Sequence, residues 1–238
     1  MPDHAVLTAD DHRDLRVRTD RGAALGDAVM CCMAMPSEFR EVQAHYPILF
    51  QRDIERDAFS ALAMFGFENG ENLFLEGACW DAGYVPLAIR TQPFLIGGKP
   101  GEPGNQVHVD MASARIATSD DGMRVFDEEG RPTPYLEAIV DQLGALDAGY
   151  AGSGDFFAAL RRHDLLEPLS LEITLDDGST NRLVGFHVID EARLAGLDAE
   201  ALGALSTDDH LMPIFMAVAS IGRLRELIAR KNAAVANG

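Results

Sequence analysis

The sequence predicts an α+β fold with a mixed or antiparallel, β-rich core and with helices concentrated in the C-terminal half. Continuous or alternating apolar runs, which are typical of strands, dominate the first half. Apolar residues at helical spacing begin only after Pro132. Within the helical half, an Asp-Asp-Gly-Ser turn at 176–179 joins two alternating runs and predicts a β-hairpin. This order lacks the strict alternation of strands and helices that a parallel sheet requires.

Six strands are predicted before residue 132. Continuous apolar runs suit buried strands, and alternating runs suit strands with one exposed face. Ser37 is expected to cap a helix over residues 38–45, which Pro47 ends. The turn Asp120–Gly122 predicts that the strands on either side of it form a hairpin. The expected strands cover residues 14–19, 25–35, 48–52, 58–67, 107–117 and 123–126.

Helices are predicted from Thr133 onward. Thr133 is an N-cap followed by Pro134 at the first helical position, and apolar residues then recur at helical spacing as far as Leu143. Ser153 or Asp155 is expected to cap a second, separate helix. Later helices are expected over residues 190–194, 198–205 and 211–231.

Composition excludes several classes of protein. The 238 residues carry a formal charge of −18, and 47% of them are hydrophobic, so the chain is too apolar to be intrinsically disordered. A charge this negative argues against nucleic-acid binding. The sequence has no run of about 18 apolar residues, so we expect no membrane span.

The cysteines and the N-terminus favour a cytoplasmic protein. Cys31, Cys32 and Cys79 are odd in number, two of them are adjacent, and all have apolar neighbours, so a disulfide framework is not expected. The first 20 residues lack a basic region followed by an apolar stretch, which a secretory signal requires. We expect a single domain over 1–238, with a candidate sub-boundary at the Gly- and Pro-rich loop 97–104.

One short motif is compatible with a metal site. His108-Val109-Asp110 lies on a predicted strand, where residues two apart share a face, and such a pair with a distal histidine is the ligand set of non-haem iron oxygenases. His187, on the predicted hairpin, suits the third position better than His163 or His210. The same tripeptide is also common in ordinary strands with outward polar residues, and we expect no bound metal.

Two segments rich in aromatic residues and proline are candidates for ligand contact. They cover residues 38–50 and 80–94, and we expect them to meet in space. Tryptophan, tyrosine and arginine are enriched at binding hot spots, and rigid Tyr-Pro units suit a pocket wall. The alternative is that the rings belong to the core and that the arginine forms an internal ion pair. The candidate ligand-binding residues are His45, Tyr46, Trp80, Tyr84 and Arg90.

Several short motifs occur in a fixed order along the chain. They lie at Glu38–Arg40 with His45–Ile48, at Trp80 with Tyr84–Pro86, at Ile89–Arg90 with Pro93–Phe94, at Val125–Thr133 and at Leu183–Glu191. In this order they resemble the motifs of the SapC family of bacterial proteins. The resemblance extends from about residue 5 to residue 231.

The resemblance implies a role but no chemistry. The family is named after surface-layer-associated proteins, and it comes with no established activity, so no catalytic residue can be transferred. Its members tend to occur near flavin-dependent tryptophan-halogenase-like proteins, cupin-like proteins and TonB-dependent receptors. The resemblance therefore implies an accessory role in acquiring or modifying an imported compound.

Two hypotheses of different classes follow. We favour a non-catalytic, cytoplasmic binding or accessory protein without a cofactor. It would act with a halogenase-like or cupin-like partner enzyme, or bind a peptide or a small acidic ligand through the five candidate residues. The alternative is an enzyme of unrecognised type, such as an iron oxygenase that uses His108, Asp110 and His187. The enzyme hypothesis requires a converging cluster of His, Asp and Glu side chains in a pocket.

Overall fold

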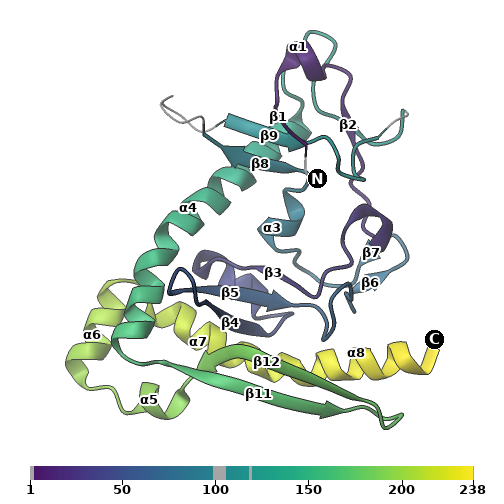
Figure 1. Cartoon of the computed structure of the whole chain (residues 1–238). Helices are drawn as coiled ribbons and strands as arrows, with labels where there is room; N and C mark the ends of the chain where they lie inside the picture. The colour runs from purple at the N-terminus through teal and green to yellow at the C-terminus, as the bar shows by residue number, and fades with distance from the viewer. Residues whose placement is uncertain (1–2, 99–105, 118–119, 238) are drawn as a thin grey trace. The chain divides into compact units, whose positions relative to one another are not determined.

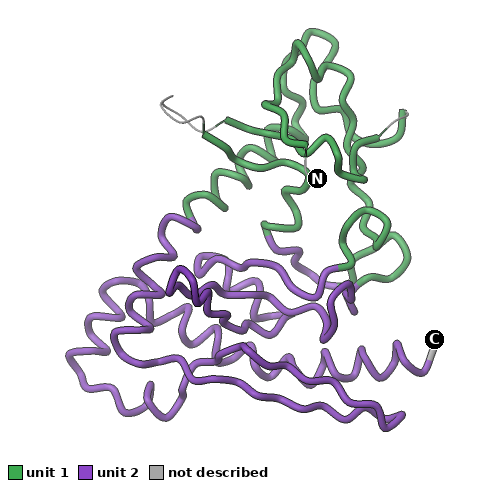
Figure 2. Tube along the Cα trace, in the orientation of Figure 1, with its two compact units in different colours: residues 1–28, 75–81, 87–148 green, residues 29–74, 82–86, 149–238 purple. Residues whose placement is uncertain are grey.

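The computed structural model describes residues 3–98, 106–117 and 120–237. The chain divides into two compact units, each made of segments that are separate in the sequence (Figure 2). Unit 1 comprises residues 1–28, 75–81 and 87–148, and unit 2 comprises residues 29–74, 82–86 and 149–238. The loop 97–104, the candidate sub-boundary, lies largely outside the described residues, and the residues that flank it belong to unit 1.

Unit 1 is built from small antiparallel sheets and helical segments. Three strands pair in the order β1 (His4–Val6), β9 (Gln106–Asp110) and β8 (Phe94–Gly97). Two further pairs are β10 (Met123–Arg124) with β2 (Arg16–Val17), and β6 (Leu75–Glu76) with β7 (Cys79–Trp80). The helical segments are α1 (Ala9–His12), the short 3-10 helix η1 (Ala23–Leu25), α3 (Leu87–Arg90) and the part of α4 (Pro134–Arg162) up to residue 148.

The core of unit 1 joins its strands to one face of α4. Val17 and Val109 are completely buried on β2 and β9. Leu136, Ile139 and Leu143 recur at helical spacing on α4 and pack against them. The apolar spacing seen in the sequence therefore marks the face of α4 that covers this core.

The expected hairpin of residues 107–117 with 123–126 is wrong. β9 pairs with β1 and β8, whereas β10 pairs with β2. The strand ends at Asp110 because its carboxylate accepts hydrogen bonds from the backbone N–H of Ala112, at 3.1 Å, and of Asp3, at 3.0 Å. An aspartate that binds the backbone two residues onward initiates a turn, so the chain leaves the sheet there.

Unit 2 contains a five-stranded antiparallel sheet. Its strands lie in the order β11 (Leu166–Thr174), β12 (Thr180–Ile189), β4 (Ile48–Asp53), β5 (Ala58–Met64) and β3 (Cys31–Met33). The hairpin predicted around the Asp-Gly turn is confirmed as β11 and β12, and Gly178 adopts a φ of 86° in that turn, which glycine tolerates best. The strand expected over 25–35 is reduced to β3, because Gly26 at a φ of 90° ends the preceding η1.

Helices of the C-terminal half cover this sheet, which confirms the predicted α+β class. In Figure 1 the hairpin runs alongside α8, and the backbone N–H of Asp176 donates to Asn232 Oδ1 at 3.1 Å. The expected short helices are confirmed, with Asp190 and Asp198 as their N-caps. The helical segments of unit 2 are η2 (Pro36–Glu38), α2 (Phe39–Val42), the part of α4 from residue 149, α5 (Glu191–Ala195), α6 (Ala199–Thr207), α7 (Leu211–Ser220), η3 (Ile221–Arg223) and α8 (Leu224–Asn237).

Two predicted helix starts are wrong. α4 is continuous from Pro134 to Arg162, so Ser153 and Asp155 lie inside it. Ser153 Oγ donates to the carbonyl oxygen of Gly149 at 2.6 Å, so its hydroxyl is satisfied within the helix and caps nothing. Ser37 is not a cap either, because the carboxylate of Glu38 accepts the N–H of Met35 at 3.0 Å, and Met35 takes the N-cap position two residues before Ser37.

Candidate ligand-binding site

Three of the five candidate residues, His45, Tyr46 and Tyr84, lie together in unit 2. Tyr46 stands between α2 and β4, and its hydroxyl donates to the backbone carbonyl of Tyr84. The ring of His45 lies against Gly83 so closely that a Cβ there would be 2.9 Å from Nε2. The expected meeting of the two aromatic segments is therefore confirmed for Tyr46 and Tyr84.

The polar groups of this cluster bind one another. The Tyr84 hydroxyl donates to Glu38 Oε2 at 2.7 Å, and Glu38 Oε1 accepts the N–H of Met35 at 3.0 Å. Tyr46 is 0% exposed and packs edge-on against two phenylalanines, so it belongs to the core of unit 2. His45 and Tyr84 are half-buried, so these two members of the cluster reach the surface. Ligand contact at these residues stays a prediction.

The other two candidates, Trp80 and Arg90, belong to unit 1. Trp80 lies on β7 opposite Leu75 and is 9% exposed, so most of its ring area is used in packing. Arg90 is the last residue of α3, is half-buried and lines a cavity. Of the five, Arg90 therefore has the surroundings that favour a ligand most.

The cavity beside Arg90 has a volume of about 200 Å³ and a lining rich in arginine. Its described lining includes four arginines and no acidic residue, in a chain that has 38 acidic and 20 basic residues. Tyr135 and Gln142, two turns apart on α4, complete the polar part of the wall. The arginines are Arg18 and Arg21 after β2, Arg90 on α3, and Arg115 after β9.

A buried carboxylate fixes two of these guanidinium groups. Arg115 is 1% exposed, and its Nη2 donates to Asp27 Oδ1 at 2.5 Å while Nη1 donates to the carbonyl oxygen of Asp20 at 2.9 Å. Arg21 Nη1 donates to Asp27 Oδ1 at 3.4 Å and to the carbonyl oxygen of Ile89 at 3.3 Å. Asp27 itself is 0% exposed. Buried charges persist only when paired in this way, so both arginines are held in place before any ligand arrives.

Positive charge is concentrated around this cavity. Burial lowers the pKa of Arg21, and the charge of Arg115 lowers it further, although Asp27 compensates in part. Arginine nonetheless keeps its proton in proteins. Burial raises the pKa of Tyr135 to about 12, so its phenol remains a neutral donor at physiological pH. A negatively charged ligand would reduce the repulsion between the guanidinium groups.

Two buried polar atoms of the wall have no hydrogen-bond partner within the described protein. They are Arg115 Nε and Gln142 Oε1. A buried polar group without a partner costs free energy, and a ligand that supplies the partner recovers it. An acid oxygen can accept from Arg115 Nε, whereas Gln142 Oε1 is itself an acceptor and needs a donor elsewhere on the ligand. Planar guanidinium groups match the geometry of carboxylate and phosphate oxygens. The cavity is therefore suited chemically to an acid group.

The comparison with family models decides what kind of chain this is. A model described as SapC matches residues 7–227. The chain belongs to the SapC family. The match includes every residue named above in the cavity of this SapC protein. No curated protein and no solved structure is significantly similar to it.

No helix within the described part of this SapC chain is both long and apolar enough to cross a membrane. The longest, α4, has 29 residues, but charged residues interrupt it.

The iron-site hypothesis draws its residues from both units of the SapC chain. His108 and Asp110 lie on β9 in unit 1, and His187 lies on β12 in unit 2. The Asp110 carboxylate is occupied by backbone donors, and the His108 ring lies 2.8 Å from the position that a Cβ of Gly97 would take. Among the residues described, no group of three or more His, Cys, Asp or Glu side chains could hold a metal ion.

Sequence reasoning missed most of the cavity. It found Arg90 through its aromatic neighbours but not the other residues, because only the fold brings their segments together. The one local signal was that Arg18 and Arg21 lie in an arginine-rich segment of an acidic chain. The missed residues are Arg18, Arg21, Arg115, Tyr135 and Gln142.

Proposed function

We propose that this SapC protein is a non-catalytic binding protein whose ligand is a small acid with a carboxylate or phosphate group. The proposal rests on one observation, the cavity that four arginines line without an acidic residue among its described walls. Charge-assisted hydrogen bonds to such groups are short and strong. A volume of about 200 Å³ accommodates the acid group and a small attached skeleton.

The side chains of the cavity favour binding over catalysis. General acid–base chemistry needs a group that titrates near the working pH, usually histidine, aspartate or glutamate. The described lining contains none of these, and the raised pKa of Tyr135 keeps its proton in place. Its guanidinium groups are hydrogen-bond donors that keep their charge, so they can hold an anion without exchanging protons with it.

An accessory role in the cytoplasm completes the proposal. The family resemblance suggests a partner enzyme of the halogenase-like or cupin-like class. The SapC protein would present the acid to that enzyme or sequester it. Copurification of the SapC protein with the neighbouring halogenase-like protein tests the proposed partnership. If the two proteins do not copurify, the proposed binding of an acid is unaffected.

Calorimetric titration of the full chain tests the acid site. The panel pairs each acid with its uncharged amide, for example benzoate with benzamide, and includes succinate and inorganic phosphate. We expect at least one acid to bind saturably while its amide does not. The Arg90→Ala variant removes a charged hydrogen bond worth about 1.5–3 kcal/mol. Its affinity should therefore fall about 10- to 150-fold, with little change in thermal midpoint.

Arg131→Ala is the matched control. It removes the same charge from unit 1, but the Arg131 side chain is 71% exposed and lies outside the cavity lining. Equal losses of affinity in both variants would show that only the overall charge of the protein matters, and this would contradict the proposal. If Arg90→Ala unfolds the protein, Arg90 is structural, and Tyr135→Phe then tests the cavity without a change of charge. Failure of the whole panel to bind would also overturn the proposal.

A further inference from the structure

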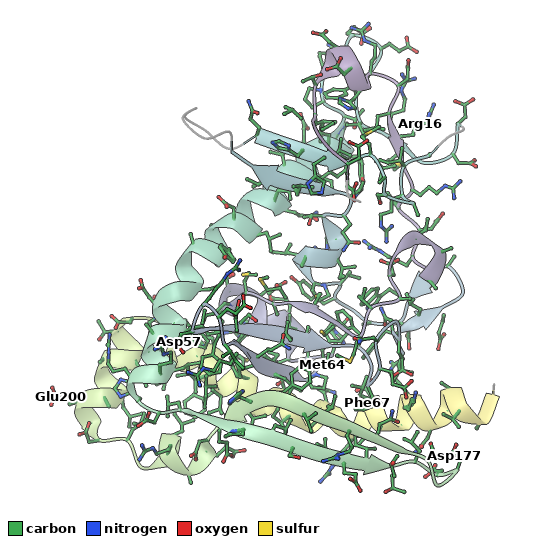
Figure 3. The ribbon with its side chains drawn as sticks, viewed as in Figure 1. Arg16, Asp57, Met64, Phe67, Asp177 and Glu200 are labelled. Carbon is green, nitrogen blue, oxygen red and sulfur yellow. The ribbon has the colours of Figure 1, made fainter. Side chains whose placement is uncertain are left out.

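A second cavity lies wholly within unit 2. Its volume is about 540 Å³, which is in the range of about 300–1,000 Å³ typical of small-molecule pockets. It is bounded by the end of β3, by the turn between β4 and β5 and by the second half of α4. Figure 3 labels Asp57 in that turn, and Arg161 Nη2 of α4 donates to Asp57 Oδ2 at 2.9 Å.

The cavity is hollow because α4 presents small residues to it. Ala151, Gly154 and Ala158 follow one another at helical spacing, so they share the face that lines the cavity. Gly154 has no side chain, and a Cβ placed there would meet no atom within 4 Å. Larger residues at these three positions would fill the space. The sequence of this face therefore maintains an opening between the helix and the sheet edge.

The remaining walls are apolar, aromatic and partly exposed. Met33 is 41% exposed and Tyr150 is 65% exposed, although both are large side chains. Phe59 and Phe157 add half-buried rings. Thioether sulfur and aromatic edges make favourable contacts with aromatic rings. A flat aromatic molecule would cover exposed surface on all of these groups at once.

The charges at the mouth of the cavity neutralise one another. The lining contains two arginines and two aspartates, and they are paired as Arg161 with Asp57 and Arg56 with Asp53, at 2.9 and 3.8 Å. An ionic ligand would therefore gain little net attraction here. This cavity differs in that respect from the arginine-rich cavity of unit 1, so the two differ in the chemistry of the ligand they select.

We propose that the cavity beside Gly154 is a second binding site, which takes a small uncharged aromatic molecule. The site lies outside the acid-binding function proposed above and does not depend on it. Its apolar walls would supply the affinity, and its paired rim charges would exclude acids and amines.

Fluorescence titration of the full chain with N-phenyl-1-naphthylamine, an uncharged two-ring probe, tests the proposal. We expect saturable binding of one probe per chain with a blue-shifted emission. In Gly154→Leu the new side chain occupies the cavity, and binding should weaken at least 10-fold. Gly152→Leu is the matched control, because Gly152 lies on the same helix with open space at its Cβ but does not line the cavity. This variant should bind the probe as the parent does.

Four outcomes would overturn the proposal. They are failure of the parent protein to bind the probe, equal binding by both leucine variants and the parent, equal loss in both leucine variants, and displacement of the probe by an acid that binds the arginine-rich cavity. Sedimentation supplies a fifth: a dimer that Gly154→Leu dissociates would identify a second copy of the chain as the occupant. Probe binding that only Gly154→Leu weakens, in a protein whose oligomeric state is unchanged, supports the proposal.

Discussion

Asp27→Asn is expected to destabilise unit 1 strongly. Asp27 is 0% exposed, and its partner Arg115 is 1% exposed with 2.5 Å between Oδ1 and Nη2. Asparagine keeps the shape of the side chain but not its charge, so the guanidinium of Arg115 remains buried without a counter-charge. Removing one partner of a buried ion pair costs about 3–5 kcal/mol. For a chain of this length that cost lowers the thermal midpoint by roughly 6–20 °C.

Urea denaturation followed by fluorescence measures this loss directly. Trp80 is the only tryptophan of the chain and lies in unit 1, so its emission reports on that unit. Asp57→Asn is the control, because the Asp57 side chain is 53% exposed although it too pairs with two arginines. Exposed pairs contribute about 0–1 kcal/mol. The reasoning is refuted if Asp27→Asn shifts the denaturation midpoint no further than Asp57→Asn does.

Three further predictions concern single residues. Gly149→Ala should lower the free energy of unfolding, because the new Cβ would lie 2.9 Å from Met35 Cβ. Gly152→Ala has open space around its new Cβ and should raise the free energy of unfolding by about 0.5–1 kcal/mol. Chemical denaturation of the two variants and the parent measures both changes. Burial lowers the pKa of His187, as does the nearby Arg52. The unfolded chain therefore binds the proton more readily than the folded protein does. The contribution of His187 to folding stability is complete above the unfolded pKa of about 6.5 and is lost as the pH falls below it. The stability of the parent relative to His187→Gln should therefore decrease between pH 7.5 and 5.5. Finally, purified protein should hold no stoichiometric iron or zinc; elemental analysis that finds one equivalent, lost in His108→Ala, would contradict this.

Local signals predicted the elements they encode and failed where distant contacts decide. The hairpin β11–β12 and the Asp caps of α5 and α6 depend on a few adjacent residues, so the sequence was sufficient for them. α4 was split in the prediction because Ser153 looks like a cap, yet the helix continues through it. The partner of β10 was missed because β2 lies more than 100 residues earlier in the chain.

The candidate site was predictable only in part, for the same reason. Arg90 was found because it stands beside aromatic residues in the sequence. Arg115 follows an unremarkable turn, and its significance depends on Asp27, 88 residues earlier. Tyr46 was expected in a pocket wall, but its hydroxyl satisfies a backbone carbonyl and its ring is completely buried. Composition cannot distinguish a tyrosine that faces a ligand from one that completes a core.

The interleaving of the two units determines the order in which they can be completed on the ribosome. Every segment of unit 1 has been synthesised by residue 148. Strands β3, β4 and β5 of unit 2 emerge much earlier than β12, the neighbour that covers the open edge of β4. At typical rates of translation this delay is on the order of ten seconds. During that time a nascent chain carries an unpaired edge strand with an apolar face, which is the kind of surface that chaperones recognise and that aggregates when left uncovered.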